Sequence, residues 1–220
     1  MIVDGDAPLD WDSARAGIEV LTRSGRRSLV GVLARAFRDN PMNVRIHGPD
    51  PRRRIRANAA GLRSLVLDHA QRVIVMGITY DSRVIGGFVL APPGERRLPG
   101  PSFRRQIECL YLQGRAAIAA WSEVAVGVPD HRPAGDHWYL AVLGVEPAWQ
   151  GRGVGAALLA EIDRRVSRDP RPVCLESDRP ASVRFYQRHG FAIRAEGEVH
   201  SVPCWCLGRG FPPGTAECPP

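Results

Sequence analysis

The sequence predicts an α/β (α+β) fold, and three observations carry this prediction. Two runs rich in β-branched residues flank Asp81-Ser82, which is a good hairpin signal. A buried strand over 138–143 leads through a glycine-rich loop into an amphipathic helix. A second strand, a second helix and a closing hairpin follow in that order, so strands and helices alternate in the later half of the chain.

The individual elements follow from hydrophobic spacing and from turn residues. The sequence Asp39-Asn40-Pro41 ends the first helix, and Pro51 starts a later one. The expected strands are 18–22, 73–80, 83–90, 138–143, 173–176, 191–196 and 203–207. The expected helices are 26–37, 51–70, a pair within 102–126, 156–166 and 179–190. Residues 91–101 and 127–136 are expected to be loops.

The strongest functional signal is the loop after the central strand, Gln150-Gly151-Arg152-Gly153-Val154-Gly155. Its glycines allow a tight turn and leave backbone N–H groups uncovered. The helix that follows places the positive end of its dipole at the same point. The loop therefore predicts a site for a phosphate or a pyrophosphate. At the end of the preceding strand, Gly144 predicts a bulge or a close backbone approach.

Several interpretations of this loop compete. A Walker loop is excluded because it needs lysine, and all 30 basic residues of the chain are arginine. A dinucleotide-binding turn fits Gly151, Gly153 and Ala156 poorly, because the bend at Glu146-Pro147 separates the loop from its strand. A tight turn without a ligand is a further alternative. The pattern Gln/Arg-x-x-Gly-x-Gly/Ala, by contrast, is matched in full by Gln150, Gly153 and Gly155.

This last pattern resembles the acetyl-CoA loop of the GNAT acyltransferases. A second motif supports the likeness, because Phe185-Tyr186 followed by Gly190-Phe191 resembles the tyrosine helix of that family. Three local features resemble the puromycin N-acetyltransferase type within the family. They are His131-Arg132-Pro133, Leu175-Glu176-Ser177 and Trp205-Cys206. The likeness covers about 131–207 well and 18–93 more weakly.

The resemblance implies a mixed, mostly antiparallel sheet that is flanked by helices and splayed between its two central strands. It also implies acetyl transfer from acetyl-CoA, as co-substrate, to a primary amine by direct attack, with no metal. The backbone of Leu143 and Val145 would bind the pantetheine arm, and an N–H near Val145 would stabilise the oxyanion. The implied cofactor-binding residues are Leu143, Gly144, Val145, Gln150, Gly151, Arg152, Gly153, Val154, Gly155, Ala156 and Ser182.

The resemblance also assigns the proton transfers. Tyr186 corresponds to the general acid that protonates the departing CoA thiolate. Glu176, at the end of the second strand, is the leading candidate for the general base. Glu123, Asp136 and His137 are the reserve candidates, and Glu146 is expected to be a solvated loop acid.

The acceptor is expected to be a small-molecule amine, such as an antibiotic or a metabolite. A protein or an aminoacyl-tRNA is an alternative acceptor, and a non-catalytic acetyl-CoA sensor is an alternative function. The net charge of +7 does not discriminate, because CoA and nucleic acid both carry phosphates. The densest basic cluster, Arg52-Arg53-Arg54 with Arg56, predicts either a solvated helix face or a binding patch. We expect neither a nucleic-acid partner nor a membrane partner.

We expect an N-terminal extension over 1–17, a single domain over 18–210 and a disordered tail over 211–220. The chain has no apolar stretch near 18 residues and no signal-peptide pattern, so a cytoplasmic location is predicted. Its five cysteines lack zinc-type spacing and predict buried thiols. The expected state is a monomer or a homodimer, and residues 204–207 could form an exposed edge strand for pairing with a second copy.

Overall fold

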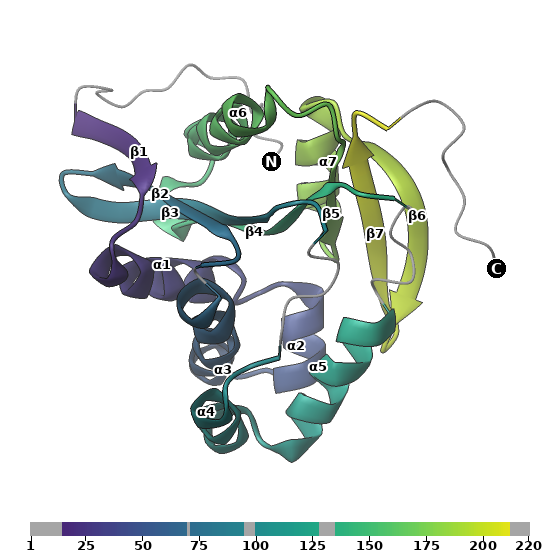
Figure 1. The fold of residues 1–220 in the computed structure, drawn as a ribbon. Helices are drawn as coiled ribbons and strands as arrows, with labels where there is room; N and C mark the ends of the chain where they lie inside the picture. The colour runs from purple at the N-terminus through teal and green to yellow at the C-terminus, as the bar shows by residue number, and fades with distance from the viewer. Residues whose placement is uncertain (1–14, 70, 95–99, 128–134, 212–220) are drawn as a thin grey trace.

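The computed structural model describes residues 15–69, 71–94, 100–127 and 135–211, and its centre is a sheet of seven strands (Figure 1). The strands are β1 (Ala16–Val20), β2 (Ile74–Tyr80), β3 (Arg83–Ala91), β4 (Trp138–Val145), β5 (Val173–Ser177), β6 (Ala192–Val199) and β7 (Val202–Arg209). Their order in the sheet is β1-β2-β3-β4-β5-β7-β6. All neighbours are antiparallel except β4 and β5, which are parallel. The predicted mixed, mostly antiparallel sheet is therefore confirmed.

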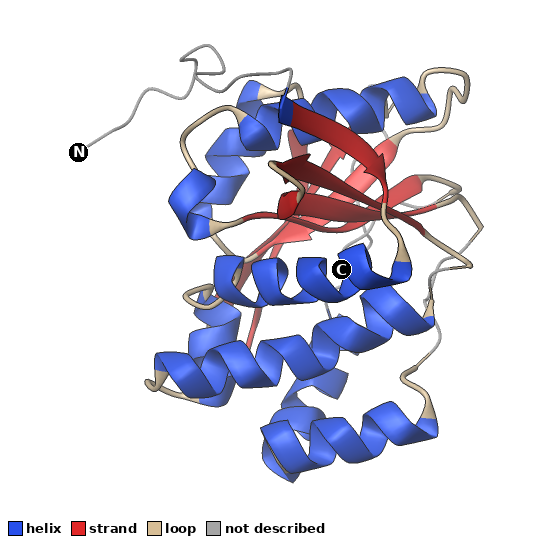
Figure 2. Cartoon of the chain, turned by 90° about the vertical axis from the view of Figure 1, so that its left-hand side faces the viewer, coloured by secondary structure: helices blue, strands red, loops and turns tan. Residues whose placement is uncertain are grey.

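Helices cover both faces of this sheet (Figures 1 and 2). The α-helices are α1 (Arg23–Ala36), α2 (Pro41–His47), α3 (Pro51–Arg63), α4 (Phe103–Gln113), α5 (Arg115–Gly127), α6 (Val154–Val166) and α7 (Pro180–Arg188). A π-helical turn, η2 (Ser64–Asp68), continues α3, and a 3-10 turn, η4 (Pro147–Trp149), follows β4. Helices α6 and α7 lie on one face, and α1 to α5 lie on the other. Within the described part of the chain, no helix has the length and apolar character that crossing a bilayer requires.

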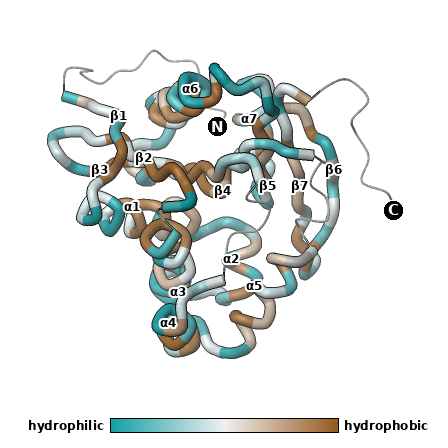
Figure 3. Tube along the Cα trace, in the orientation of Figure 1, coloured by the Kyte–Doolittle hydropathy of each residue, from teal (hydrophilic) through white to brown (hydrophobic). Residues whose placement is uncertain are grey.

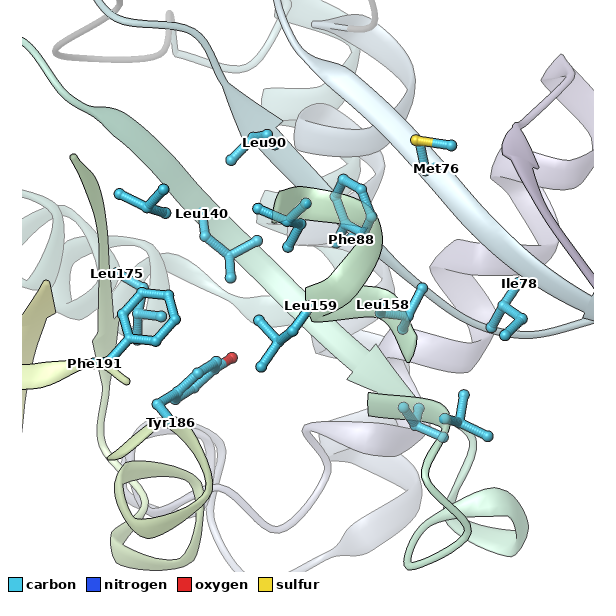
Figure 4. Packing of buried hydrophobic residues seen from close by; sticks show 14 of the residues in the cluster. Met76, Ile78, Phe88, Leu90, Leu140, Leu158, Leu159, Leu175, Tyr186 and Phe191 are labelled. Carbon is cyan, nitrogen blue, oxygen red and sulfur yellow. The ribbon is translucent and has the colours of Figure 1, made fainter. Parts of the chain in front are cut away.

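The sheet separates two hydrophobic cores, because successive side chains of a strand point to opposite faces. In β2, Met76 and Ile78 belong to the core under α6 and α7 (Figure 4), whereas Val75 belongs to the core under α1. The central strands are accordingly apolar along most of their length (Figure 3). Full burial of each such side chain is worth about 1.5–3 kcal/mol, so both faces hold the strands in place.

The hairpin predicted at Asp81-Ser82 is confirmed. Asp81 and Ser82 have φ values of 47° and 61°, in the left-handed region that the tight turn between two twisted strands requires. His200 and Ser201 adopt the same conformation between β6 and β7, with φ values of 52° and 61°. Both hairpins therefore turn in two residues.

Three expectations need correction. The sequence Asp39-Asn40-Pro41 ends α1 but also starts α2, because Pro41 occupies the first helical position. β7 is not an edge strand, since it lies between β5 and β6; an exposed edge at 204–207 was therefore wrong. β1 begins at Ala16, so the expected extension over 1–17 loses its last residues to the sheet. The rest of that extension, and the tail from 212, lie outside the described residues.

The basic cluster on α3 is not uniform. Arg52, Arg53 and Arg56 are exposed, but Arg54 is only 6% exposed. Its guanidinium donates to the carbonyl oxygens of Arg38 (2.7 Å), Gly48 (2.9 Å) and Pro49 (2.6 Å), and it pairs with Asp39 (2.7 Å). Arg54 thus fixes the connection between α1 and α3 and is unavailable for a binding patch.

Candidate active site

The sheet opens between β4 and β5. The two strands pair only at Trp138↔Val173 and Tyr139↔Cys174, and beyond these positions no other described strand pairs with β4 on that side. The Glu146 N–H donates to the Ile85 carbonyl oxygen on β3 (2.8 Å). Because backbone polar groups alternate along a strand, those of Val145, and by the same alternation those of Leu143, face the gap. The predicted splay between the central strands is present.

A β-bulge sits in β4 at Ala141, where the register jumps from Leu90↔Leu140 to Val89↔Val142. The expectation of a bulge at Gly144 was wrong in position. The alternative, a close backbone approach, is correct: a Cβ on Gly144 would lie 2.6 Å from Leu33 Cδ2. Only glycine lets α1 approach the end of β4 this closely.

The bulge decides which side chains meet which helices. Before it, Leu140 packs with the core under α6 and α7, and Tyr139 packs toward α1. After it, Leu143 and Val145 face α6 and α7, whereas Val142 faces α1. An unbulged strand would put Val142 on the side of Leu140. The extra residue therefore turns Val142 toward the helices α1 to α5 while the backbone of Leu143 and Val145 lines the gap.

The glycine-rich loop ends in the N-terminus of α6. Gly151 and Gly153 have φ values of 74° and 76°, and no side chain caps the helix. The first intrahelical bond runs from the Ala157 N–H to the Gly153 carbonyl oxygen (3.0 Å). The preceding N–H groups, those of residues 154–156, have no acceptor within the helix. They form the positive end of the α6 dipole beside the gap, which is the geometry that binds a phosphate.

Two contacts hold this loop in position. The Gln150 amide donates through Nε2 to the Val145 carbonyl oxygen (3.0 Å), so this side chain ties the loop to the end of β4. The Arg35 guanidinium grips both carboxylate oxygens of Glu146, at 2.9 Å and 3.1 Å from Nε and 2.6 Å from Nη2. Glu146 is therefore an anchored residue, and its expected role as a solvated loop acid was wrong.

The two motifs predicted from the sequence meet in space. A Cβ on Gly155 would lie 3.1 Å from the Phe185 ring atom Cζ, so α6 and α7 touch at this glycine. Next to Phe185, Tyr186 is 8% exposed and makes edge contacts with the rings of Phe185 (5.2 Å) and Phe191 (5.6 Å). Figure 4 shows the Tyr186 hydroxyl directed away from α7, toward β4 and Leu159.

Burial raises the pKa of Tyr186 above the ordinary value of a phenol. Among the described residues no hydrogen-bond partner reaches its hydroxyl. The phenol therefore keeps its proton at neutral pH and has a donor available for a bound molecule. Ser182 lies four residues earlier on the same face of α7 and is half-buried.

Glu176 lies on the opposite side of the sheet from Tyr186. The Tyr139 hydroxyl donates to Glu176 Oε2 (2.6 Å), and both residues stand where β4 and β5 begin to diverge. Tyr139 was not predicted as a site residue. A tyrosine in a buried strand gives no functional signal, and its partner lies 37 residues further along the chain. The hydrogen bond fixes the orientation of the carboxylate.

The reserve candidates lie elsewhere. Glu123 is 67% exposed on α5 and pairs with His200 (3.2 Å) at the β6–β7 turn. Asp136 and His137 precede β4, at the end where β4 and β5 are paired and the sheet is closed. None of the three is beside the gap. The motif His131-Arg132-Pro133 lies outside the described residues.

The four described cysteines, Cys109, Cys174, Cys204 and Cys206, are buried thiols outside any disulfide, as predicted. In the part of the chain that the structure describes, no group of three or more His, Cys, Asp or Glu side chains could hold a metal ion.

Comparisons with known proteins agree with this geometry. A family model described as an acetyltransferase (GNAT) domain matches residues 113–193. A mycothiol acetyltransferase of Mycobacterium sp. (strain JLS) is 42% identical over 68 residues, which is 28% of this chain and 23% of that protein. The alignment thus spans under a quarter of this curated relative.

Solved structures resemble the whole fold. A histone acetyltransferase HPA2 and related acetyltransferase from Corynebacterium glutamicum superposes with a TM-score of 0.64 at 19% identity, covering 89% of this chain and 96% of the other. The PaiA N-acetyltransferase of Thermoplasma acidophilum in complex with coenzyme A gives a TM-score of 0.57 at 14% identity, covering 89% and 99%. The splayed sheet, the glycine loop and the family match at 113–193 lead to one conclusion: the predicted resemblance to the GNAT acetyltransferases is confirmed, in sequence over 113–193 and in the fold of the described chain.

Proposed function

We propose that the protein transfers the acetyl group of acetyl-CoA to a primary amine of a small molecule. The observation that carries this proposal is the gap between β4 and β5, with the glycine loop at one end and Tyr186 beside it. The pantetheine arm of acetyl-CoA would pair with the backbone of Leu143 and Val145, as an added strand pairs with a sheet edge. Its pyrophosphate would lie on the N–H groups at the start of α6.

The proposed reaction is a direct attack. The neutral amine nitrogen bonds to the thioester carbonyl carbon, and the carbonyl oxygen becomes an oxyanion near the Val145 N–H. The intermediate collapses by breaking the carbon–sulfur bond, and the Tyr186 hydroxyl protonates the departing CoA thiolate. The proton released by the amine passes to Glu176, directly or through water. The proton taken up by Glu176 balances the one that Tyr186 gives to the thiolate and returns to Tyr186 through water, so the products are the acetamide and CoA in its thiol form.

Binding energy contributes by holding the two reactants together. A thioester and an amine fixed at attack distance react as one molecule, which is worth roughly 7–11 kcal/mol of the barrier in favourable cases. The Arg35–Glu146 pair and the Gln150 hydrogen bond support this task, because they fix the loop relative to β4.

The test is release of free thiol from acetyl-CoA against a panel of primary amines. The panel contains aromatic amines, aminoglycosides, polyamines and peptides with free N-termini. Release that depends on an added small amine, with the acetylated amine detected by mass spectrometry, supports the proposal. CoA binding by calorimetry without release from any small amine shifts the proposal to a macromolecular acceptor or to a sensor. An absence of CoA binding overturns it.

A further inference from the structure

A cavity of about 1000 Å³ lies on the side of the sheet covered by α1 to α5. Its walls come mainly from α2, α3, α4 and α5, and Phe37 after α1 and Val142 on β4 also line it. Val142 immediately precedes Leu143, whose backbone faces the gap. The cavity therefore extends from the surface to the strand on which we propose that acetyl-CoA binds. Its size suits a small molecule rather than a protein surface.

The lining is apolar and uncharged. Among the lining residues that the structure describes, none is Asp, Glu or Arg; the polar ones are amides, hydroxyls, one thiol and one histidine. At the mouth, α4 exposes three apolar side chains that belong to the cavity wall: Phe103 is 78% exposed, Ile107 54% and Leu110 47%. A ligand with an apolar body would remove this surface from water, whereas a polycation would find no counter-charge on these walls.

Two buried polar atoms of the wall have no hydrogen-bond partner among the residues that the structure describes. Asn43 is 7% exposed and His47 is 2% exposed, and one helical turn separates them on α2. Asn43 donates through Nδ2 to the Phe37 carbonyl oxygen (3.0 Å), which leaves its Oδ1 unpaired. His47 accepts the Trp121 indole N–H at Nε2 (3.1 Å), which leaves its Nδ1 unpaired.

The protonation state of His47 follows from its surroundings. Burial, with a smaller contribution from the positive charge of Arg53, lowers the pKa of His47 to about 4, so its ring is neutral at pH 7. A neutral imidazole that accepts at Nε2 carries its proton on Nδ1. Asn43 Oδ1 is thus a free acceptor and His47 Nδ1–H a free donor, side by side on one helix face. Leaving both unpaired in an apolar wall is costly, so they mark a place for a complementary group.

We infer that this cavity binds the acceptor, and that the acceptor is an amine with a mainly apolar, uncharged body carrying a carboxamide. The carboxamide N–H donates to Asn43 Oδ1, and its oxygen accepts from His47 Nδ1–H. The apolar body fills the cavity and covers the exposed side chains of α4. The amine extends past Val142 toward the gap. This inference rests on the proposed function, since it names the substrate class of the same site.

The experiment compares three primary amines that share one body: an arylalanine carboxamide, the corresponding free acid, and the arylethylamine that lacks the carboxamide. We expect kcat/KM for the carboxamide to exceed that for the other two by roughly tenfold to a hundredfold, the range expected for one or two buried hydrogen bonds.

Asn43→Leu and His47→Phe should each lower the carboxamide-to-arylethylamine ratio of kcat/KM about tenfold. Activity on the arylethylamine reports that the variants are folded. Gln71→Leu, which changes an exposed amide outside the cavity, should leave the ratio unchanged.

The failure of this inference is distinguishable from the failure of the proposed function. The inference is overturned, and acetyl transfer still stands, if thiol release is fastest with a polyamine. The same holds if neither Asn43→Leu nor His47→Phe changes the carboxamide-to-arylethylamine ratio of kcat/KM. An absence of release from every amine overturns the proposed function. In that case, calorimetry with the N-acetylated carboxamide still tests the cavity: binding that Asn43→Leu weakens supports it, and no binding overturns it. The inference is also overturned if the protein is a dimer, if Phe103→Ser abolishes the dimer, and if this variant leaves turnover of the carboxamide unchanged. That result would assign the exposed face of α4 to a second copy of the chain.

Discussion

The Tyr186 hydroxyl combines a retained proton with a free donor position, which is what a general acid needs. We expect Tyr186→Phe to lower kcat about 100-fold, within the range of general acid catalysis, and to leave CoA affinity nearly unchanged. Single-turnover kinetics and calorimetry measure the two effects. Tyr111→Phe, on an 88% exposed tyrosine of α4, serves as the control. Unchanged turnover of Tyr186→Phe would remove Tyr186 from the mechanism.

The direction of the Tyr186 pKa also predicts a pH profile. A general acid works only while protonated, and a raised pKa extends its protonated range to higher pH. We therefore expect kcat to show no falling limb below pH ~10, the ordinary pKa of tyrosine. A falling limb centred below that value in the wild type, and missing in Tyr186→Phe, would contradict the burial argument.

The Tyr139–Glu176 hydrogen bond makes Tyr139 a positioning residue for the proposed base. Removing a hydrogen bond to a charged group costs about 1.5–3 kcal/mol, so Tyr139→Phe should lower kcat about tenfold or more. KM for acetyl-CoA should stay unchanged, because the proposed cofactor contacts, at Leu143 and Val145, lie at the other end of β4. A variant that changes KM and leaves kcat intact would assign Tyr139 a purely structural role.

Asp178 ties α2 to the loop after β5. Its carboxylate accepts from the Met42 N–H (2.8 Å) and from Asn40 Nδ2 (3.2 Å), yet burial outweighs these bonds and raises the pKa of Asp178. A carboxyl with a raised pKa holds its proton more tightly when folded than when unfolded. Its contribution to the free energy of unfolding is therefore full below the unfolded pKa of ~3.9, and it is lost as pH rises through the folded pKa.

Urea unfolding of the wild type and of Asp178→Asn between pH 3 and pH 7 tests this sign. The stability of the wild type relative to the variant should fall as pH rises above ~3.9, because only the wild-type carboxyl titrates. If the stability of the wild type relative to Asp178→Asn instead grows with pH, the two hydrogen bonds lower the pKa of Asp178 by more than burial raises it.

At the scale of single residues, local motifs decided what could be predicted. Gly151, Gly153 and Tyr186 lie in motifs with fixed local spacing, so the sequence identified them, and their roles in binding and catalysis stay predictions. Tyr139 and Asp178 act on partners distant in sequence, so no local pattern reveals them. Their contacts depend on which strand faces and loops the fold brings together.

At the scale of elements, the approach of α1 to β4 depends on one glycine. A Cβ on Gly144 would lie 2.6 Å from Leu33 Cδ2, so Gly144→Ala must displace α1 or force Leu33 from its rotamer. Overpacking of this kind costs about 1–3 kcal/mol of stability. Gly100→Ala, where nothing lies within 4 Å of the added Cβ, is the matched control. Thermal unfolding compares the two, and equal stabilities would show that the helix moves without cost.

The same scale explains the errors of element prediction. α2 has seven residues, too few for a hydrophobic period, and its first residue is the proline that also ends α1. The bulge at Ala141 was missed because an extra residue in a uniformly apolar strand leaves the composition unchanged. It becomes visible only through the register with β3.

At the scale of the molecule, the sheet is incomplete between β4 and β5, and an added molecule that pairs with the free edge of β4 would join its two halves. A ligand that binds only the folded state stabilises it by about 2.7 kcal/mol at 100 times its Kd. For a protein of this size that corresponds to a rise in Tm of about 5–10 °C. Calorimetric scans with and without CoA measure the shift. An unchanged Tm at saturating CoA would argue against the added-strand geometry.

The order of elements was predictable because hairpins, proline and glycine punctuate the chain clearly. The cavity was not, because its wall comes mainly from four helices, with further residues from a π-helical turn, loops and one strand, and no local pattern says how those elements pack together. The two unpaired atoms of α2 matter only because the fold buries them.

The guanidinium clamps described above have one further consequence. Arg35 holds the bend that leads into the glycine loop, and Arg54 holds the connection between α1 and α3. The chain contains no lysine, so arginine supplies every such contact. Guanidinium nitrogens keep their proton at any physiological pH and are poor nucleophiles toward thioesters. No side chain of the protein is a primary amine, so no side-chain amine competes with the proposed acceptor for the acetyl group. In the proposed reaction, a protein that holds a reactive acyl donor against its own sheet is thereby protected from acetylation of its own side-chain amines.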